Sequence, residues 1–238
     1  MSEPARDLQR PKAGPAGASV HPERKKSVGR EYAEALIVAL ALAIFIRTFF
    51  IQAYKIPSGS MEPTLLVGDH ILVNKLIYGI RVPDSILGLN VPGLPYGQYV
   101  VNFEPVHRGD VVVFVFPPDR TKDFIKRVIG VPGDKVQVKN GAVLLNGSPM
   151  DDPHAHFEVS PSDRSTVSPR DNFGPVTVPP GKLLMMGDNR DRSYDSRFWG
   201  FVDQNDVEGR AMIIYWSWDS DGNSILPIRW GRFGKLIH

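Results

Sequence analysis

Apolar and polar positions divide the chain into three parts. Residues 1–30 are rich in Pro, Gly, Ala and charged residues and have no apolar periodicity, which is typical of a disordered tail. Residues 35–46 then form an uninterrupted apolar stretch, which extends to residue 51 if one arginine and one threonine are included. From residue 56 onward, short apolar runs separated by Pro and Gly predict β-strands. We therefore expect a tail, one apolar helix and a β domain.

The apolar stretch is interpreted as a membrane anchor over residues 31–53. Residues 35–51 are at the short end of the roughly 17–25 residues that cross a bilayer. Two alternatives stay open, namely a cleaved signal peptide and a buried helix of a soluble domain. The long leader and the lack of a small-x-small site after residue 51 argue against cleavage. Basic residues precede the stretch, so the positive-inside rule predicts a cytoplasmic N-terminus and an extracytoplasmic domain, residues 54–238.

The domain after the anchor is predicted to be mainly antiparallel β-sheet. The runs that predict strands are residues 71–73, 110–116, 124–129, 135–139, 143–145, 183–186 and 212–216. Asn140-Gly141 between two of these runs is a strong hairpin signal. Residues 83–105 and 151–180 lack such a pattern, and we expect them to be loops or small extensions.

Composition narrows the classes of function. The chain has 238 residues, 42% of them hydrophobic, which is enough for one domain with a real core. The net charge is +2, but residues 1–30 hold seven basic and three acidic residues, so the remainder sums to about −2. A general nucleic-acid binder would instead be basic over its folded domain. The sequence has no cysteine, which excludes disulfides, thiolate nucleophiles and Cys-ligated metal sites.

A candidate nucleophile lies shortly after the apolar stretch. Residues 57–65 read Pro-Ser-Gly-Ser-Met-Glu-Pro-Thr-Leu. A small Ser-Gly-Ser step between two prolines suits a serine that is held on a constrained backbone. A serine alone is a poor nucleophile, so this interpretation depends on a base elsewhere in the chain.

Lys126 is the candidate base. In a strand over residues 124–129, its side chain shares a face with Phe124 and Val128, while Arg127 lies on the opposite face. Apolar neighbours can desolvate a lysine, which disfavours the ammonium form and lowers the pKa from about 10.4. The alternative is a solvent-facing lysine on an edge strand, because exposure is the usual fate of lysine.

A third segment, residues 187–200, is dense in charge yet bracketed by apolar residues. Its alternating carboxylates and guanidiniums can form bidentate pairs. The hydroxyls of Ser193 and Ser196 could orient a buried amine by hydrogen bonding. A solvated, charged loop is the alternative.

In this order, and after one N-terminal span, the three segments resemble bacterial type I signal peptidases. The matching patterns are Pro-Ser-Gly-Ser-Met-x-Pro-Thr-Leu from residue 57, Lys-Arg-Val-Ile-Gly-x-Pro-Gly-Asp from residue 126, and Gly-Asp-Asn-Arg-Asp-x-Ser-x-Asp-Ser-Arg-x-Trp-Gly from residue 187. The resemblance covers roughly residues 33–238. It implies a barrel-like antiparallel β catalytic domain in which the second β-subdomain, about residues 135–186, is reduced.

The resemblance also implies roles for single residues. Ser60 would be the nucleophile and Lys126 its general base. Ser58 and the backbone N–H of Ser60 would form the oxyanion hole, and Ser193 would orient the lysine. Asp195 and Arg197 would form a structural ion pair behind the site. The positions that would line the substrate groove are Tyr54, Ile56, Pro57, Met61, Leu65, Phe124 and Ile125.

The implied activity is that of an endopeptidase of the inner (cytoplasmic) membrane that cleaves after Ala-x-Ala-like sites through an acyl-enzyme. Its implied partners are the signal peptides of secretory preproteins and the lipid bilayer, with the protein-export translocon as a further candidate. No cofactor, metal or nucleic acid is expected. The alternatives are a specialised Ser/Lys maturation peptidase of the same fold and an inactive membrane-tethered scaffold. A distance beyond about 6 Å between Ser60 Oγ and Lys126 Nζ would favour the scaffold.

Two histidines and two tryptophans allow further interpretations. His154 and His156 suggest a metal site but lack a credible third ligand, so a loop histidine pair is expected. Composition alone does not exclude a Ser/His/Asp triad. Trp216 and Trp218 lie two residues apart and share a face, for which core packing is the default and a membrane-contacting rim the alternative.

Overall fold

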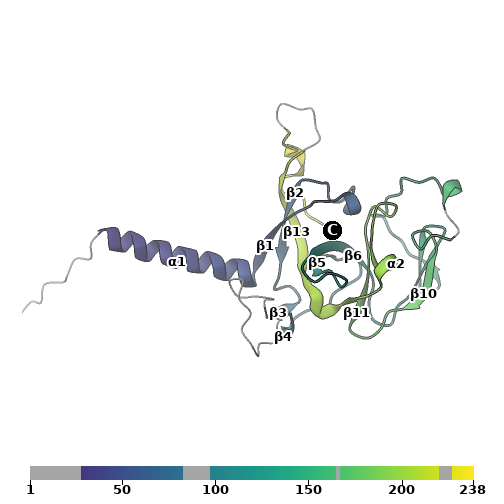
Figure 1. The fold of residues 1–238 in the computed structure, drawn as a ribbon, viewed down its shortest axis with the longest axis horizontal. Coiled ribbons are helices and arrows are strands. Elements are labelled where there is room, and N and C mark those ends of the chain that lie inside the picture. Colours follow the sequence, from purple (N-terminus) through teal and green to yellow (C-terminus); the bar gives the residue numbers. More distant parts are fainter. Residues whose placement is uncertain (1–27, 83–96, 165–166, 220–226) are drawn as a thin grey trace, which may run out of the picture. The chain divides into compact units, whose positions relative to one another are not determined.

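The computed structural model describes residues 28–82, 97–164, 167–219 and 227–238 (Figure 1). The chain forms two compact units, residues 1–41 and 42–238. The predicted tail lies outside the described residues, apart from residues 28–30, which open the first helix.

That helix, α1 (Val28–Phe49), carries most of the predicted anchor. Its 22 residues rise roughly 33 Å, which matches a hydrocarbon core of roughly 30 Å. No residue of α1 is buried, and the helix is long and apolar enough to cross a membrane. The predicted anchor was too long at its C-terminal end, because strand β1 begins at Ile51. The continuous apolar run across residues 49–51 conceals this change from helix to strand.

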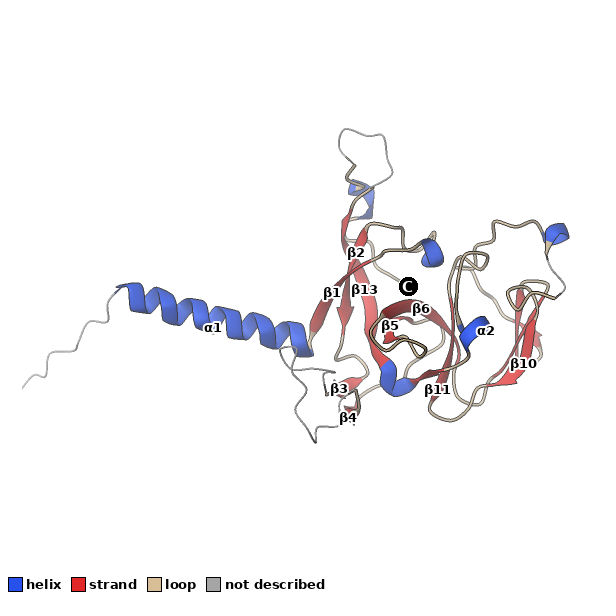
Figure 2. Ribbon diagram, in the orientation of Figure 1, coloured by secondary structure: helices blue, strands red, loops and turns tan. Residues whose placement is uncertain are grey.

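Seven strands, each antiparallel to its neighbours, form a curled main sheet in the order β1-β2-β13-β5-β6-β11-β12 (Figure 2). Their bounds are β1 (Ile51–Lys55), β2 (Asp69–Asn74), β5 (Val111–Val115), β6 (Asp123–Gly130), β11 (Lys182–Met186), β12 (Val202–Asp203) and β13 (Val207–Ser217). Register shifts interrupt the pairing of β13 with both β2 and β5, and such bulges bend a strand. The mainly antiparallel β fold predicted from the sequence is confirmed.

A second sheet has four strands in the order β10-β7-β8-β9. Its members are β7 (Lys135–Lys139), β8 (Ala142–Leu145), β9 (Ser148–Pro149) and β10 (Phe173–Thr177). The predicted hairpin between β7 and β8 is confirmed. Asn140 has φ 51° and Gly141 has φ 83°, which is the left-handed pair that a type I′ turn needs. A two-stranded sheet of β3 (Gly79–Arg81) and β4 (Tyr99–Asn102) completes the described strands.

Two segments predicted as loops contain strands. β4 lies within residues 83–105, of which residues 83–96 are outside the described part of the chain. β10 lies within residues 151–180 and pairs with β7. Gly174 and Pro175 interrupt any alternation in β10, so this strand depends on its partner rather than on its own pattern.

Strand β6 runs through the middle of the hydrophobic core. Ile125 packs against one buried cluster, Val128 belongs to a second, and Ile129 belongs to a third. The third cluster joins residues of β6 and β11 to Val136 and Val138 of the second sheet. A side chain on β6 is therefore held by packing on several sides.

Candidate active site

Ser60 and Lys126 lie in hydrogen-bond contact. Ser60 is in a single 3₁₀ turn, Gly59–Met61, and Lys126 is in the middle of β6. Ser60 Oγ and Lys126 Nζ are 2.7 Å apart, although 66 residues separate them in the sequence. Lys126 Nζ also donates to the carbonyl oxygen of Ile125 at 2.9 Å. This geometry is far inside the separation that would favour an inactive scaffold.

Backbone hydrogen bonds fix the chain on both sides of Ser60. The N–H of Ile56 donates to Asp69 O at 2.8 Å, and the N–H of Leu65 donates to Met61 O at 2.9 Å. Ile56, Met61 and Leu65 are buried in the same core cluster. The serine turn is thus anchored in the core before and after the nucleophile.

Burial sets the protonation of Lys126. The residue is 4% exposed and lies on a strand between β5 and β11, so it is not at a sheet edge. Desolvation lowers its pKa from 10.5 to about 8, although the charges of Asp195 and Asp188 act in the opposite direction. Near pH 8 a large fraction of this amine is therefore neutral and able to accept a proton.

The loop after β11 connects the two catalytic segments. Asp188 accepts two hydrogen bonds from Arg127, from Nε at 2.8 Å and from Nη2 at 2.7 Å. The same carboxylate accepts a hydrogen bond from Thr64 Oγ1 at 2.6 Å. The backbone N–H of Asn189 donates to Ser60 O at 3.2 Å. One loop therefore holds both the strand of the base and the turn of the nucleophile.

Asp195 and Arg197 form a second buried pair in this loop. Arg197 donates to the carboxylate from Nε and from Nη2, both at 2.8 Å. Burial alone would raise the pKa of the Asp195 carboxyl, but the Arg197 guanidinium holds it below its usual value. Asp195 also accepts the N–H of Gly187 at 3.1 Å, and Arg197 donates to Arg190 O at 2.8 Å. The pair thus shapes the backbone of its own loop.

An open pocket of about 480 Å³ lies over the serine and the lysine. Its wall combines residues of the serine turn, β6 and the loop after β11. The lining residues are Ser58, Gly59, Ser60, Glu62, Val67, Phe124, Lys126, Arg192 and Tyr194. The pocket gives a peptide access to Ser60, although the serine is only 7% exposed.

Comparison with known proteins identifies the family. A family model described as signal peptidase, peptidase S26, matches residues 29–216. The chain belongs to this signal peptidase family. A probable signal peptidase I-2 of Synechocystis is 38% identical, with 78% of this chain and 72% of that protein covered. A signal peptidase I of Leptolyngbya laminosa is 35% identical, with 88% and 91% covered.

A solved structure of a family member is also similar. The crystal structure of a signal peptidase I from Enterococcus faecalis is 28% identical and covers 46% of this chain and 98% of that chain, with a TM-score of 0.37. The family resemblance predicted from the three motifs is confirmed by the family model and the relatives. With α1, membership in this family identifies a membrane-anchored protein.

The two accessory serines of the family pattern have different environments. Ser58 is exposed and lines the pocket next to the nucleophile. Ser193 is 5% exposed; its Oγ makes no hydrogen bond within normal geometric limits among the described residues, although it lies close enough to Asp195 to help lower the pKa of that carboxyl. No hydrogen bond therefore joins Ser193 to Lys126 in this structure, and both accessory roles stay predictions.

Most of the predicted groove residues do not line this pocket. Ile56 is 2% exposed, and Met61 and Leu65 are fully buried. Ile125 packs against the cluster that they form, and the hydroxyl of Tyr54 donates to the carboxylate of Glu208. Pro57 is exposed, and Phe124 is the member of the predicted set that lines the pocket. The apolar side chains near Ser60 in sequence therefore pack into the hydrophobic core that holds the serine turn.

Several site residues were not predicted. Glu62, Arg192 and Tyr194 line the pocket, but they occupy positions that the family patterns leave open. The pairing of Arg127 with Asp188 was also missed. A signal existed for it, because an aspartate two residues after a buried strand needs a nearby partner if it is buried as well.

The other candidate residues lie elsewhere. His154 and His156 line a separate pocket together with His238. Within the described residues, no three His, Cys, Asp or Glu side chains are arranged to hold a metal ion. Trp216 is partly buried and packs against Phe233, with ring centroids 5.1 Å apart, whereas Trp218 is 41% exposed.

Proposed function

We propose that this chain is a membrane-bound serine endopeptidase that removes N-terminal signal peptides from exported preproteins. One observation carries the mechanism, namely the 2.7 Å distance between Ser60 Oγ and Lys126 Nζ, two side chains that are almost completely buried. The lowered pKa of the lysine supports a base role at moderate pH. Membership in the signal peptidase family supports the substrate class.

In the acylation step, neutral Lys126 takes the proton of Ser60 while Oγ attacks the carbonyl carbon of the last signal-peptide residue. The resulting oxyanion accepts hydrogen bonds from the Ser58 hydroxyl and the Ser60 N–H. Loss of one such donor typically raises the barrier by about 2.7–4 kcal/mol. The lysine ammonium then gives its proton to the leaving amine of the mature chain, and an ester joins the signal peptide to Ser60.

In the deacylation step, Lys126 is neutral again and takes a proton from a water molecule. The water oxygen attacks the ester carbonyl, and the C–Oγ bond breaks. Ser60 regains its proton from the lysine, and the signal peptide leaves with a free carboxylate. In both steps Ser193 would orient the amine of Lys126 by hydrogen bonding.

Substrate recognition follows from the same site. The segment around the scissile bond would lie as an extended strand beside the pocket, with Phe124 among its contacts. Shallow apolar subsites would accept the small side chains of Ala-x-Ala-like sites.

The proposed setting is the inner (cytoplasmic) membrane. The helix α1 would cross it once, with the basic N-terminal segment in the cytoplasm and the catalytic unit outside. Preproteins also arrive with an apolar segment in the bilayer, so anchoring brings enzyme and substrate to the same surface. The protein-export translocon is the expected source of these substrates.

Preprotein cleavage in lipid vesicles tests the proposal. Ser60→Ala and Lys126→Ala should each abolish cleavage while the protein stays folded by circular dichroism. Lys126→Arg should also be inactive, because a guanidinium does not lose its proton at usable pH. Matched controls are Ser148→Ala on β9 and Lys122→Ala on the turn before β6, both exposed, which should cleave normally. Cleavage by folded Ser60→Ala would contradict the proposal.

A further inference from the structure

We propose that Arg192 is a specificity-determining residue that favours an acidic side chain of the substrate close to the scissile bond. The inference deepens the proposed peptidase function and rests on it. Arg192 lines the same pocket as Ser60 and Lys126. Its position in the sequence lies between Asp191 and Ser193, inside the loop that holds the catalytic pair.

A closed set of contacts ties Arg192 to the nucleophile. The backbone N–H of Arg192 donates to Asn189 Oδ1 at 3.1 Å, and Asn189 Nδ2 donates to Glu158 Oε1 at 2.9 Å. Glu158 Oε2 in turn lies 2.7 Å from Arg192 Nε. Asn189 is fully buried, and its own N–H donates to Ser60 O. The guanidinium is thereby held at a defined place relative to Ser60, unlike an untethered surface arginine.

Further hydrogen bonds fix the segment that carries Glu158, the ion-pair partner of Arg192. The backbone N–H groups of Glu158 and Val159 donate to the Asp191 carboxylate at 2.6 and 2.7 Å. Arg164 lies 3.3 Å from the other oxygen of this carboxylate. The segment that carries Glu158 is therefore fixed to the loop of Arg192 at two points.

The guanidinium of Arg192 can still bind a substrate carboxylate. Among the described residues, Glu158 is its charged partner, and the closest approach of the pair is to Nε. The side chain of Arg192 is 65% exposed. The two terminal nitrogens can therefore bind a carboxylate in a forked geometry, which a single ammonium cannot do.

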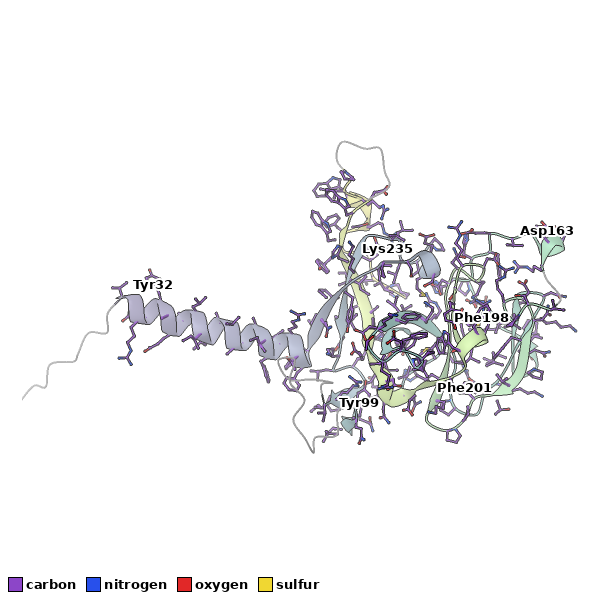
Figure 3. All side chains as sticks on the ribbon, in the orientation of Figure 1. Tyr32, Tyr99, Asp163, Phe198, Phe201 and Lys235 are labelled. Carbon is purple, nitrogen blue, oxygen red and sulfur yellow. The ribbon has the colours of Figure 1, made fainter. Side chains whose placement is uncertain are left out.

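The pocket also holds an opposite charge. Glu62 follows the serine turn, and its carboxylate packs against Gly59, where an added Cβ would meet Glu62 Cδ at 2.9 Å. Within the described residues, Glu62 takes part in no ion pair. Tyr194 also lines the pocket, and its 55% exposed side chain packs against Phe198 with ring centroids 5.5 Å apart. Phe198 lies on the short helix α2 (Ser196–Trp199) and is labelled in Figure 3. A substrate strand in this pocket thus meets an arginine and a glutamate at different places.

A charge scan of peptide substrates tests the inference. The substrates are variants of one signal-peptide-derived peptide. Each variant carries Asp, Asn or Lys at a single position, chosen from the three positions on either side of the scissile bond. The readout is the ratio of kcat/KM for Asp to that for Lys within each enzyme in detergent, so overall activity cancels. At one position the wild type should favour Asp by about three- to fivefold, as expected for a partly exposed charge pair. Arg192→Glu should invert this ratio, and Arg192→Gln should bring it close to one.

Two further variants distinguish a local effect of Arg192 on one substrate position from the effect of the enzyme's net charge. Lys139→Glu makes the same charge change at an exposed position of β7 and should leave every ratio unchanged. Glu62→Gln should alter the ratio at a different position from Arg192→Gln. Equal effects of Lys139→Glu and Arg192→Glu, or an unchanged ratio in Arg192→Glu, would overturn the inference alone. If the wild type fails to cut the parent peptide, the proposed function falls and the inference falls with it.

Discussion

Arg127 and Asp188 form a bidentate ion pair that is almost completely removed from solvent, with side chains 2% and 0% exposed. The pair joins β6, which carries the base, to the loop that contacts the serine turn. Thr64 and the backbone of Gly109 complete its hydrogen bonds. A buried pair of this kind gives little net stability, but removal of one partner is strongly destabilising because the other charge stays buried.

We therefore expect Arg127→Ala to destabilise the protein by about 3–5 kcal/mol, because Asp188 would keep a buried, uncompensated charge. Thermal or denaturant unfolding of the full chain in detergent measures this. The control is Lys182→Ala, which breaks the 2.9 Å pair with Asp203, whose side chains are 41% and 37% exposed. That change should cost less than about 1 kcal/mol. Equal losses in the two variants would contradict this account of the pair.

The pH dependence of cleavage should follow Lys126. Burial places its pKa at about 8, and only the neutral amine can take the proton of Ser60. Below pH 8, kcat/KM should fall about tenfold for each pH unit, and above pH 8 it should level off. The measurement is a pH profile of kcat/KM with a neutral peptide. A profile that is flat from pH 6 to pH 9 would argue against lysine as the base.

The same pKa also predicts a change in stability. Between pH 8 and pH 10.5 the unfolded lysine binds a proton that the folded state does not, so stability should rise with pH through this window. Lys126→Met keeps the apolar stem but does not titrate, and it should lack this rise. Unfolding curves at several pH values for both proteins test the expectation.

Gly187 should be intolerant of any side chain. An added Cβ would lie 2.3 Å from Ser193 Oγ and 2.3 Å from Ser60 O, so Gly187→Ala must displace the turn of the nucleophile. Misplacement of reacting groups by about 1 Å can lower rates roughly hundredfold, and we expect a loss of kcat of at least this order. Gly231→Ala is the control, since nothing lies within 4 Å of its Cβ position. Wild-type kcat in Gly187→Ala would show that the turn can move without consequence.

Ser193→Ala separates a catalytic role from a structural one. The Ser193 hydroxyl lies beside the Asp195 carboxylate and helps to lower its pKa, so its removal should change stability by no more than about 1–2 kcal/mol. If the hydroxyl orients Lys126 during the reaction, kcat should nevertheless fall, and the ascending limb of the pH profile should move. Unfolding and pH–rate measurements on one variant show both effects. Unchanged kcat and pH profile would remove Ser193 from the mechanism.

The sequence predicted the parts of this molecule that follow local rules. Apolar runs gave the strands that supply the core, and Asn140-Gly141 gave a hairpin because only a few residues adopt its backbone angles. The pairing of Ser60 with Lys126 came from the family pattern. No local sequence rule predicts this contact, because the two residues are 66 positions apart and the order of strands in the sheet brings them together.

Other features depend on tertiary context and could not be derived in this way. β10 contains Gly174 and Pro175 and exists because β7 pairs with it. Met61 and Leu65 look like groove residues by position, but the curled sheet buries them completely. Arg192 occupies a position that the motif leaves open, so the sequence does not place it in the pocket. Its contacts with Asn189 and Glu158, which set its position, are formed only in the folded chain.

The boundary between anchor and catalytic unit gives a last prediction, because β1 begins at Ile51 and pairs with β2 from Ile51 to Lys55. A chain that starts at Phe50 keeps this strand and loses residues 1–49, including α1, which contributes no buried residue. It should fold, cleave a soluble peptide at close to the full-length rate and no longer bind lipid vesicles.

A chain that starts at Ile56 should behave differently. It exposes the edge of β2 and removes Tyr54, whose hydroxyl donates to the nearly buried carboxylate of Glu208. Glu208 keeps its 3.9 Å contact with Arg81, but loss of a hydrogen bond to a charged group costs about 1.5–3 kcal/mol. The lost strand adds to this, so unfolding should occur at clearly lower temperature. Comparing the two truncations by circular dichroism and peptide cleavage decides the boundary. If the shorter chain is as stable and active as the longer one, β1 belongs functionally to the anchor and not to the catalytic sheet.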